Sequence, residues 1–123
     1  MQDVSKIESF VEVDDCWIAK SDNVYLIGLL PSISDKLGEV TFVDRIPIGK
    51  QLSKNNVIGV LETSKSGDWP LKSPITGIVT AFNDKLNRNP GLVCSSPFED
   101  GWIVKCQISE IMELTELGQI VIR

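Results

Sequence analysis

The segment Val57-Ile58-Gly59-Val60-Leu61-Glu62-Thr63-Ser64-Lys65-Ser66-Gly67-Asp68-Trp69-Pro70 joins an apolar run to a short polar cluster that holds one lysine. The apolar run is rich in Val, Ile and Leu, a composition that favours a β-strand. Gly67 and Asp68 are residues typical of turns, and Pro70 restricts the backbone around it. The segment therefore predicts a strand over Val57–Thr63 that ends in a turn, with Lys65 at or near the exposed tip, where an enzyme can reach its amine.

Short apolar runs recur on both sides of this segment. The nine glycines of the chain fall mostly at intervals of roughly ten residues, and runs rich in Val and Ile lie between them. Strands of that length and spacing are typical of a small β-sandwich or barrel. The other candidate strands are Phe10–Val13, Trp17–Lys20, Val24–Leu29, Gly38–Val43, Gly77–Phe82 and Trp102–Gln107. The segment 84–100 is rich in Asn, Pro, Ser and Gly, so we expect a long surface loop there, or a turn of helix followed by a loop.

Two short helices are expected. The first covers residues 31–37, because Pro31 is favoured in the first turn of a helix and Gly38 is a common residue just after its end. The second covers residues 109–117, with an N-capping serine at its start, apolar residues at helical spacing and a glycine immediately after it. We expect the apolar face of this second helix to pack on the core rather than to bind a membrane.

Length and composition favour a single globular domain that comprises residues 1–123. Apolar residues make up 42% and charged residues 24% of the chain, which are ordinary values for a globular protein. The net charge of −5 argues against a nucleic-acid-binding protein, which needs a basic surface to neutralise phosphates. No apolar stretch is long enough to span a bilayer, and the N-terminal residues resemble neither a secretory signal nor a transit peptide. We therefore expect a cytoplasmic protein, or a mature organellar form, with no nucleic-acid or membrane partner.

The content of cysteine and histidine excludes several kinds of chemistry. The chain has three cysteines, no Cys-x-x-Cys pair and no histidine. A zinc site built from the usual Cys and His residues therefore lacks ligands, and Ser-His-Asp or Cys-His catalysis is excluded. We expect free thiols, no metal site and no catalytic residues. Lys65 remains the candidate for chemistry, with two interpretations: a solvated turn lysine, or a lysine that an enzyme modifies.

Longer segments of the sequence match a known family. The tract 83–105 contains Asn83-Asp84, Asn89-Pro90-Gly91-Leu92-Val93, Ser96-Pro97-Phe98 and Gly101-Trp102-Ile103-Val104-Lys105. Further matching segments are Leu37-Gly38-Glu39-Val40-Thr41-Phe42-Val43-Asp44 and Glu62-Thr63-Ser64-Lys65-Ser66-Gly67, the latter followed by Pro74 and Gly77. Over about residues 14–120 the chain resembles the H protein of the glycine cleavage system, a relative of lipoyl and biotinyl carrier domains. Within the tract 83–105 we expect Phe98 and Trp102 to be packing aromatics.

The resemblance implies a fold and a site. The fold would be mostly β, a flattened β-barrel or sandwich of the lipoyl and biotinyl carrier type with one or two short helices. Lys65 matches the lysine to which lipoate is covalently attached in that family. The flanking residues that the attaching enzyme would recognise are Glu62, Thr63, Ser64, Gly67 and Asp68. Biotin is the less favoured cofactor, because the Met-Lys-Met pattern typical of biotinyl domains is absent.

The resemblance also implies a non-catalytic carrier, in which the cofactor supplies the chemistry. Its lipoyl-lysine arm would take an aminomethyl group from glycine decarboxylase and deliver it to an aminomethyltransferase, and dihydrolipoyl dehydrogenase would reoxidise the dithiol. A lipoate-attaching enzyme is the fourth implied partner. An acidic surface around Glu62, Asp68 and Asp44 would favour docking to basic patches on these enzymes.

Three departures from the family pattern leave an alternative open. Ser64 stands where the family usually has valine, one extra residue lies between Lys65 and Pro74, and the histidines common near the first tryptophan are absent. The alternative is a divergent H-like protein that relays lipoate or octanoate to other lipoyl domains, or acts in an accessory stress pathway. An unmodified binding module that kept only the fold is a third hypothesis.

Overall fold

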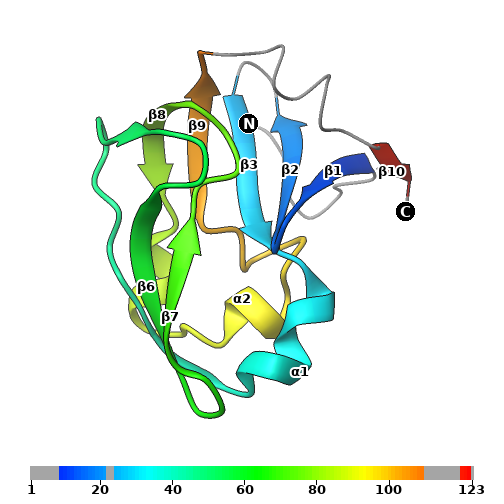
Figure 1. Cartoon of the computed structure of the whole chain (residues 1–123), viewed down its shortest axis with the longest axis vertical. Helices are drawn as coiled ribbons and strands as arrows, with labels where there is room; N and C mark the ends of the chain where they lie inside the picture. Colours follow the sequence, from blue (N-terminus) through cyan, green and yellow to red (C-terminus); the bar gives the residue numbers. More distant parts are fainter. Residues whose placement is uncertain (1–8, 22–23, 110–119, 123) are drawn as a thin grey trace.

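Two antiparallel β-sheets carry the fold (Figure 1). The computed structural model describes residues 9–21, 24–109 and 120–122. Within these residues the larger sheet has seven strands in the order β10-β1-β2-β3-β9-β8-β5, and the smaller has three in the order β4-β6-β7. The strands of the larger sheet are β1 (Ser9–Val13), β2 (Cys16–Ser21), β3 (Val24–Leu29), β5 (Gln51–Leu52), β8 (Gly77–Phe82), β9 (Val104–Ile108) and β10 (Ile120–Ile122). The strands of the smaller sheet are β4 (Val40–Val43), β6 (Val57–Thr63) and β7 (Gly67–Lys72).

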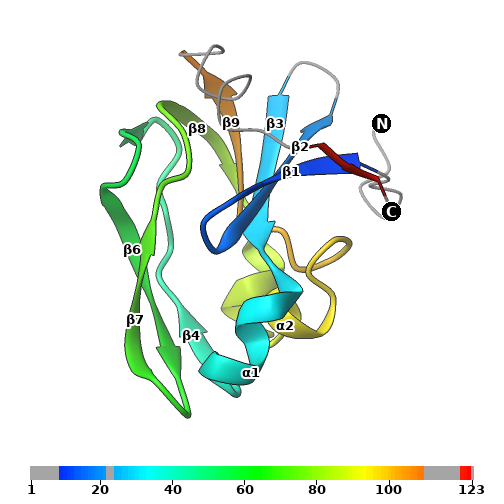
Figure 2. The same ribbon diagram turned by 45° about the vertical axis from the view of Figure 1, so that its right-hand side comes forward.

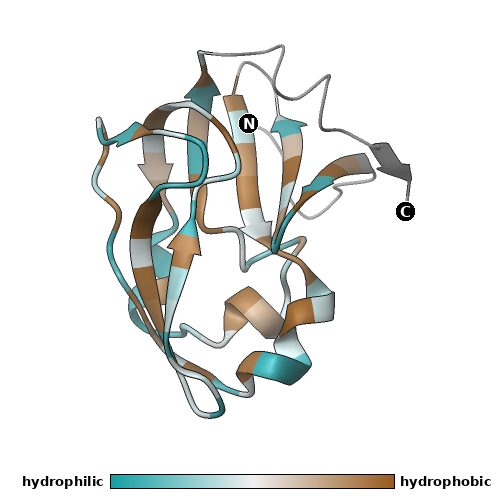
Figure 3. Cartoon of the chain, in the orientation of Figure 1, coloured by the Kyte–Doolittle hydropathy of each residue, from teal (hydrophilic) through white to brown (hydrophobic). Residues whose placement is uncertain are grey.

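Apolar side chains from both sheets meet in one core. Ile18 and Ile27 come from the larger sheet, Leu61 and Leu71 come from the smaller sheet, and all four are almost fully buried. Figure 2 shows the smaller sheet set beside the larger one, and Figure 3 shows apolar residues alternating with polar ones along the strands of both. Each buried side chain of this size stabilises the fold by about 1.5–3 kcal/mol. The predicted fold class, a mostly β barrel or sandwich of flattened shape, is confirmed.

A second apolar cluster lies on the other face of the larger sheet. Successive side chains of a strand point to opposite faces, so Trp17 packs away from Ile18. Phe98 and Trp102 cover this second cluster, and the Phe98 ring lies 4.7 Å from that of Phe10 and 5.4 Å from that of Trp17, between centroids. The prediction that Phe98 and Trp102 are packing aromatics is confirmed.

The buried side chain of Asn83 joins the beginning of the tract 83–105 to its end through hydrogen bonds. The side-chain amide of Asn83 donates to the carbonyl oxygens of Asp100 (2.6 Å) and Trp102 (2.8 Å), and its oxygen accepts from the N–H of Lys85 (3.2 Å). Each of these bonds satisfies a polar group that burial would otherwise leave without water. The tract includes two helical turns, η3 (Asp84–Asn87) and α2 (Leu92–Ser95), where a long surface loop, or a turn of helix followed by a loop, was expected.

The first predicted helix is present as two consecutive turns, η2 (Pro31–Ile33) and α1 (Ser34–Leu37). Gly38 ends α1 with a φ of 71°, a left-handed conformation that glycine adopts without steric cost. The second predicted helix, 109–117, lies outside the described residues except for its first residue. None of the helices in the described ranges is long and apolar enough to cross a membrane.

Several predicted strands agree with the structure and others were missed. The strands at 24–29, 57–63 and 77–82 have the predicted bounds, whereas the strand predicted at 38–43 begins two residues later because Gly38 ends the helix. The strand β7 was not predicted, because Pro70 led us to interpret its residues as a continuation of the turn. Proline is tolerated there because β7 is an edge strand of the smaller sheet.

Candidate functional site

The strands β6 and β7 form a hairpin whose connecting turn is Ser64-Lys65-Ser66, which we name the attachment turn. Thr63 and Gly67 are directly paired at its base, and Gly67 has a φ of 63°. Figure 1 shows this turn at the end of the hairpin farthest from β5, next to α1. Lys65 is exposed, so the structure places its side chain at the tip of a hairpin, as the sequence suggested.

The hydroxyl of Thr63 organises the attachment turn from within. It donates to the carbonyl oxygen of Gly67 (2.9 Å) and accepts from the N–H of Ser66 (3.0 Å). Only 9% of Thr63 is exposed to solvent. This side chain is therefore little accessible from outside the protein, and it contributes to the shape of the turn.

The attachment turn also contacts a segment that is distant in sequence. Ser64 and Glu39 are joined by two bonds: the Ser64 N–H donates to the Glu39 carbonyl (2.9 Å), and the Glu39 N–H donates to the Ser64 Oγ (2.9 Å). The Lys65 N–H donates to the carbonyl of Leu37 (3.0 Å), and the Lys65 Nζ donates to the carbonyl of Asp35 (3.3 Å). Sequence analysis did not predict these contacts, because residues 35–39 and 64–65 lie in separate elements.

The three acidic residues expected near the turn differ in their surroundings. Glu62 and Asp68 are both exposed and lie directly opposite each other on β6 and β7. Asp44 is half-buried, and its carboxylate accepts from the N–H of Val60 at 2.8 Å. Glu62 and Asp68 are therefore available to a partner, whereas Asp44 fastens the segment after β4 to β6.

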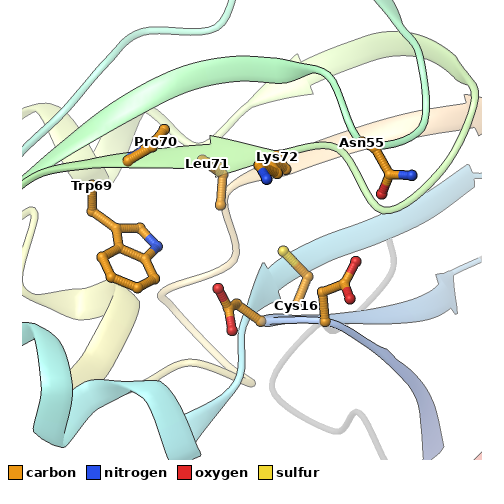
Figure 4. A pocket seen from close by; sticks show the side chains of 8 residues that line it. Cys16, Asn55, Trp69, Pro70, Leu71 and Lys72 are labelled. Atoms are coloured by element: carbon orange, nitrogen blue, oxygen red, sulfur yellow. The ribbon is translucent and has the colours of Figure 1, made fainter.

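A pocket of about 580 Å³ lies between β7 and the turn that joins β1 to β2 (Figure 4). One wall consists of Trp69-Pro70-Leu71-Lys72, and Cys16 faces it from the other side, as Figure 4 shows. The carboxylates of Asp14 and Asp15 also line the pocket. The Lys36 Nζ lies 5.7 Å from the centroid of the Trp69 ring, within the range of a cation–π interaction. Sequence analysis missed this pocket.

All three cysteines are free, as predicted. Burial, helped by the neighbouring carboxylates of Asp15 and Asp14, raises the pKa of the Cys16 thiol to about 12. Burial alone raises the pKa of Cys106 to about 12 and also raises that of Cys94. Cys16 is therefore a neutral thiol at physiological pH, although it lines the pocket. No group of three possible metal ligands occurs in the part of the chain that the structure describes.

The two-sheet frame and the attachment turn define a class: proteins of the lipoyl and biotinyl carrier fold, which present one lysine at the tip of a hairpin. A family model described as "Glycine cleavage H-protein" matches residues 8–120. The mitochondrial glycine cleavage system H protein of Flaveria pringlei is 39% identical over 101 residues, which cover 82% of this chain and 62% of that protein. The glycine cleavage system H protein of Listeria welshimeri is 34% identical over 101 residues, which cover 82% of this chain and 80% of that protein.

A solved structure agrees with the fold. The crystal structure of a glycine cleavage system H protein from Mycobacterium marinum matches with a TM-score of 0.75 and 20% identity, over 94% of this chain and 90% of that one. The chain belongs to the glycine cleavage H-protein family. It spans about three-fifths of the length of plant relatives such as the Flaveria protein, of which the match covers 62%.

Proposed function

We propose that Lys65 carries lipoate in amide linkage and that this chain is a non-catalytic lipoyl carrier of the glycine cleavage system. The observation that carries the proposal is the position of Lys65, exposed at the tip of a hairpin in a chain of the H-protein family. The Lys65 amine attacks the carbonyl carbon of an activated lipoyl group such as lipoyl adenylate. The amide bond forms, the carbon–oxygen bond to the phosphate breaks, AMP leaves with that electron pair, and the attaching enzyme takes the amine proton.

Each flanking residue of the proposed site has a distinct role. Thr63 and Gly67 shape the attachment turn, since one supplies the hydroxyl that holds it and the other has the left-handed conformation at its end. Glu62 and Asp68 supply exposed charge beside the turn. Ser64 fastens the turn to the segment after α1. A lipoate-attaching enzyme would recognise the turn around Lys65 through the shape and the exposed charge that these residues give it.

A lipoyl group on Lys65 would supply a disulfide that can take up an aminomethyl group at glycine decarboxylase and release it at aminomethyltransferase, and dihydrolipoyl dehydrogenase would reoxidise the resulting dithiol. The chain contributes presentation, because a tethered group meets each enzyme at a high effective concentration. The exposed carboxylates of Glu62 and Asp68 favour docking to basic surfaces on these three partners. The residues that would hold the arm are Trp69, which offers an aromatic face, and Asp14 and Asp15, whose carboxylates suit an amine.

Residues 1–123 are proposed to act as one carrier domain, since the N-terminal strand β1 pairs with the C-terminal strand β10 in the larger sheet. The matched relatives include mitochondrial and bacterial proteins. We propose a cytoplasmic location of the bacterial type, or a mature organellar form. Three free cysteines are consistent with a reducing compartment.

A divergent relay carrier is the second candidate function. The observation that favours it is Ser64, because a serine that bonds to Glu39 stands where the family usually has an apolar side chain. Partner enzymes that read this position would meet a different surface. Such a carrier would hold lipoate or octanoate for transfer to other lipoyl domains, or serve an accessory stress pathway, without glycine turnover.

The first test is Lys65→Arg, which keeps the positive charge but forms no lipoyl amide. We expect complete loss of lipoylation, measured by intact mass after reaction with a lipoate-attaching enzyme, and an unchanged thermal midpoint, because an exposed turn lysine contributes little to stability. Lys54→Arg is the matched control and keeps full modification. Lipoate found on another lysine would overturn the assignment.

The same proteins separate the two candidate functions. Carbon dioxide exchange from glycine is measured with glycine decarboxylase, using the lipoylated chain and the unmodified chain side by side. A carrier of glycine cleavage supports exchange only when lipoylated. Equal exchange with both forms would contradict the carrier proposal, and complete lipoylation with background exchange would establish the relay alternative.

A further inference from the structure

The attachment turn caps the C-terminal end of α1. The last carbonyls of a helix have no partner within the helix, and a short helix such as α1 (Ser34–Leu37) leaves all of its carbonyls in that position. Gly38 supplies one donor to the Ser34 carbonyl. The attachment turn supplies the other three donors: the Lys65 Nζ to the Asp35 carbonyl (3.3 Å), the Ser66 Oγ to the Lys36 carbonyl (2.8 Å) and the Lys65 N–H to the Leu37 carbonyl (3.0 Å).

The backbone beside α1 is shaped to let the turn approach. At Gly38, which has a φ of 71°, an added Cβ would overlap the Ser64 Oγ and would lie 2.8 Å from the Lys65 Cγ. The neighbouring residue Glu39 then exchanges two hydrogen bonds with Ser64, as paired residues in a sheet do, except that one acceptor is a side chain. The attachment turn therefore lies close to Gly38 and forms hydrogen bonds with the residues on either side of it, Leu37 and Glu39.

We propose that Ser64 and Ser66 are positioning residues, which hold Lys65 in one orientation because Ser66 fastens the attachment turn to α1 and Ser64 fastens it to Glu39 just after α1. The enzyme that acylates Lys65 consequently recognises a composite surface, made of the turn and of the exposed side chains of Asp35 and Lys36 beside it. The inference rests on the proposed acylation of Lys65. It adds the exposed side chains of Asp35 and Lys36, on the helix α1, to the surface that the acylating enzyme recognises. Neither serine touches the acyl donor, so both act through Lys65.

The expected effect follows from a population argument. Without the two hydroxyls, the turn keeps its internal bonds to Thr63 but loses the Oγ contacts to Glu39 and Lys36. If the orientation that the enzyme binds is then populated in a small fraction of molecules, the apparent affinity falls by that fraction. The chemical step in the bound complex is unaffected. The apparent KM should therefore rise while kcat stays nearly constant.

The test compares Ser64→Ala, Ser66→Ala and the double variant with the wild-type chain in steady-state acylation by a lipoate-attaching enzyme supplied with lipoic acid and ATP. We expect KM for the double variant to rise about tenfold, with kcat within about twofold of wild type. Ser64→Thr and Ser66→Thr keep a hydroxyl and should restore most of the affinity. Ser53→Ala, an exposed serine in the loop between β5 and β6, is the matched control. Circular dichroism establishes that every variant is folded at the assay temperature.

Two further measurements distinguish positioning from general loosening. Amide hydrogen exchange at Glu39 and Lys65 should accelerate in the double variant, while the amides of β8 and β9 keep their wild-type rates. Acylation of Lys65 by a small activated ester should proceed at the same rate in wild type and double variant, because a small reagent requires no docked turn.

The failure of this inference is distinguishable from that of the proposed function. If the wild-type chain is not acylated at Lys65, the proposed function fails and this inference with it. If wild type is acylated and the double variant has the same KM, the positioning role alone is wrong. Unchanged exchange at Glu39 in the double variant would likewise overturn it.

Discussion

The β6–β7 hairpin and the tract 83–105 are stabilised by different kinds of contact. The tip of the hairpin is polar and exposed, and hydrogen bonds attach Lys65 to α1 and Ser64 to Glu39, two residues after α1 ends. The tract 83–105 is stabilised by hydrogen bonds of the buried Asn83 to Asp100 and Trp102, and by the half-buried ring of Phe98, which packs against Phe10 and Trp17. The segment that resembles the family over the longest run is therefore a packing segment, and the segment proposed to carry the cofactor is short.

This difference separates what defines the fold from what defines the function. A residue such as Trp17 touches many neighbours in a close-packed interior, so few substitutions preserve its contacts. Ser64, the residue before Lys65, is exposed, and its hydrogen bond to Glu39 leaves the two-sheet fold unaltered. We expect substitutions in the tract to change stability and leave acylation intact, and substitutions in the turn to do the reverse.

The largest change in stability is expected for Phe98→Ala. The ring of Phe98 covers Phe10 and Trp17, and its removal leaves a gap above both rings. We expect the free energy of unfolding to fall by about 2–4 kcal/mol, somewhat below the range for fully buried phenylalanines because Phe98 is half-buried. Urea unfolding followed by tryptophan fluorescence measures the change.

The control for Phe98→Ala is Glu99→Ala, an exposed neighbour in the same tract, which should stay within about 0.5 kcal/mol of wild type. Lipoylation of Lys65 per folded molecule should be the same in Phe98→Ala, Glu99→Ala and wild type. A folded Phe98→Ala variant that is lipoylated poorly would show that the two regions are coupled, against the comparison drawn above.

A smaller loss is expected for Gly77→Ala at the start of β8. A Cβ at this position would overlap the carbonyl oxygen of Gln107 on the neighbouring strand β9. The two strands must separate locally, at a cost of about 1–3 kcal/mol in the free energy of unfolding. Gly91→Ala is the matched substitution, because among the described residues, its two chain neighbours apart, the nearest atom to its Cβ would be the Asn89 Oδ1 at 3.7 Å, an ordinary contact distance. Equal urea midpoints for the two variants would show that close approach at Gly77 is unimportant.

Sequence patterns predicted the strands correctly where the local composition favours the same backbone conformation that the sheet requires. The runs at 24–29 and 57–63 are rich in Val, Ile and Leu, and both form strands with the predicted bounds. β7 was missed because Pro70 and the preceding Gly67-Asp68 pair are typical of turns. What allows a strand there is its pairing with β6 and its place at the sheet edge. These are properties of the assembled sheet, and no local pattern reports them.

The site was predictable only in part, for the same reason. The position of Lys65 in a turn follows from its immediate neighbours. Its contacts to Asp35 and Leu37 depend on how α1 lies against the hairpin, and the pocket joins Asp15 to Trp69 across the gap between the sheets. Such long-range contacts arise from tertiary packing, so composition and spacing near Lys65 contain no trace of them.

The smallest effect is expected for Asp68→Lys, and it has opposite signs for stability and for binding. Asp68 lies directly opposite Glu62, and like charges in that arrangement repel, so the substitution should stabilise the hairpin by about 0.2–1 kcal/mol. The same change removes negative charge beside Lys65, which slows the encounter with a basic partner surface without altering the chemical step. We expect a several-fold lower on-rate for glycine decarboxylase at low salt, measured by stopped flow with the lipoylated chain.

Salt and a matched variant show whether the charge acts locally. The Debye length is about 10 Å at 0.1 M ionic strength and about 3 Å at 1 M, so the on-rates of Asp68→Lys and wild type should converge as salt is raised. Glu99→Lys changes the net charge equally but lies in the tract 83–105, and it should affect the on-rate less than Asp68→Lys does. If the two reversals slow binding equally, net charge rather than the surface beside Lys65 steers the encounter. The hairpin would then be the site of chemistry without being the site of docking.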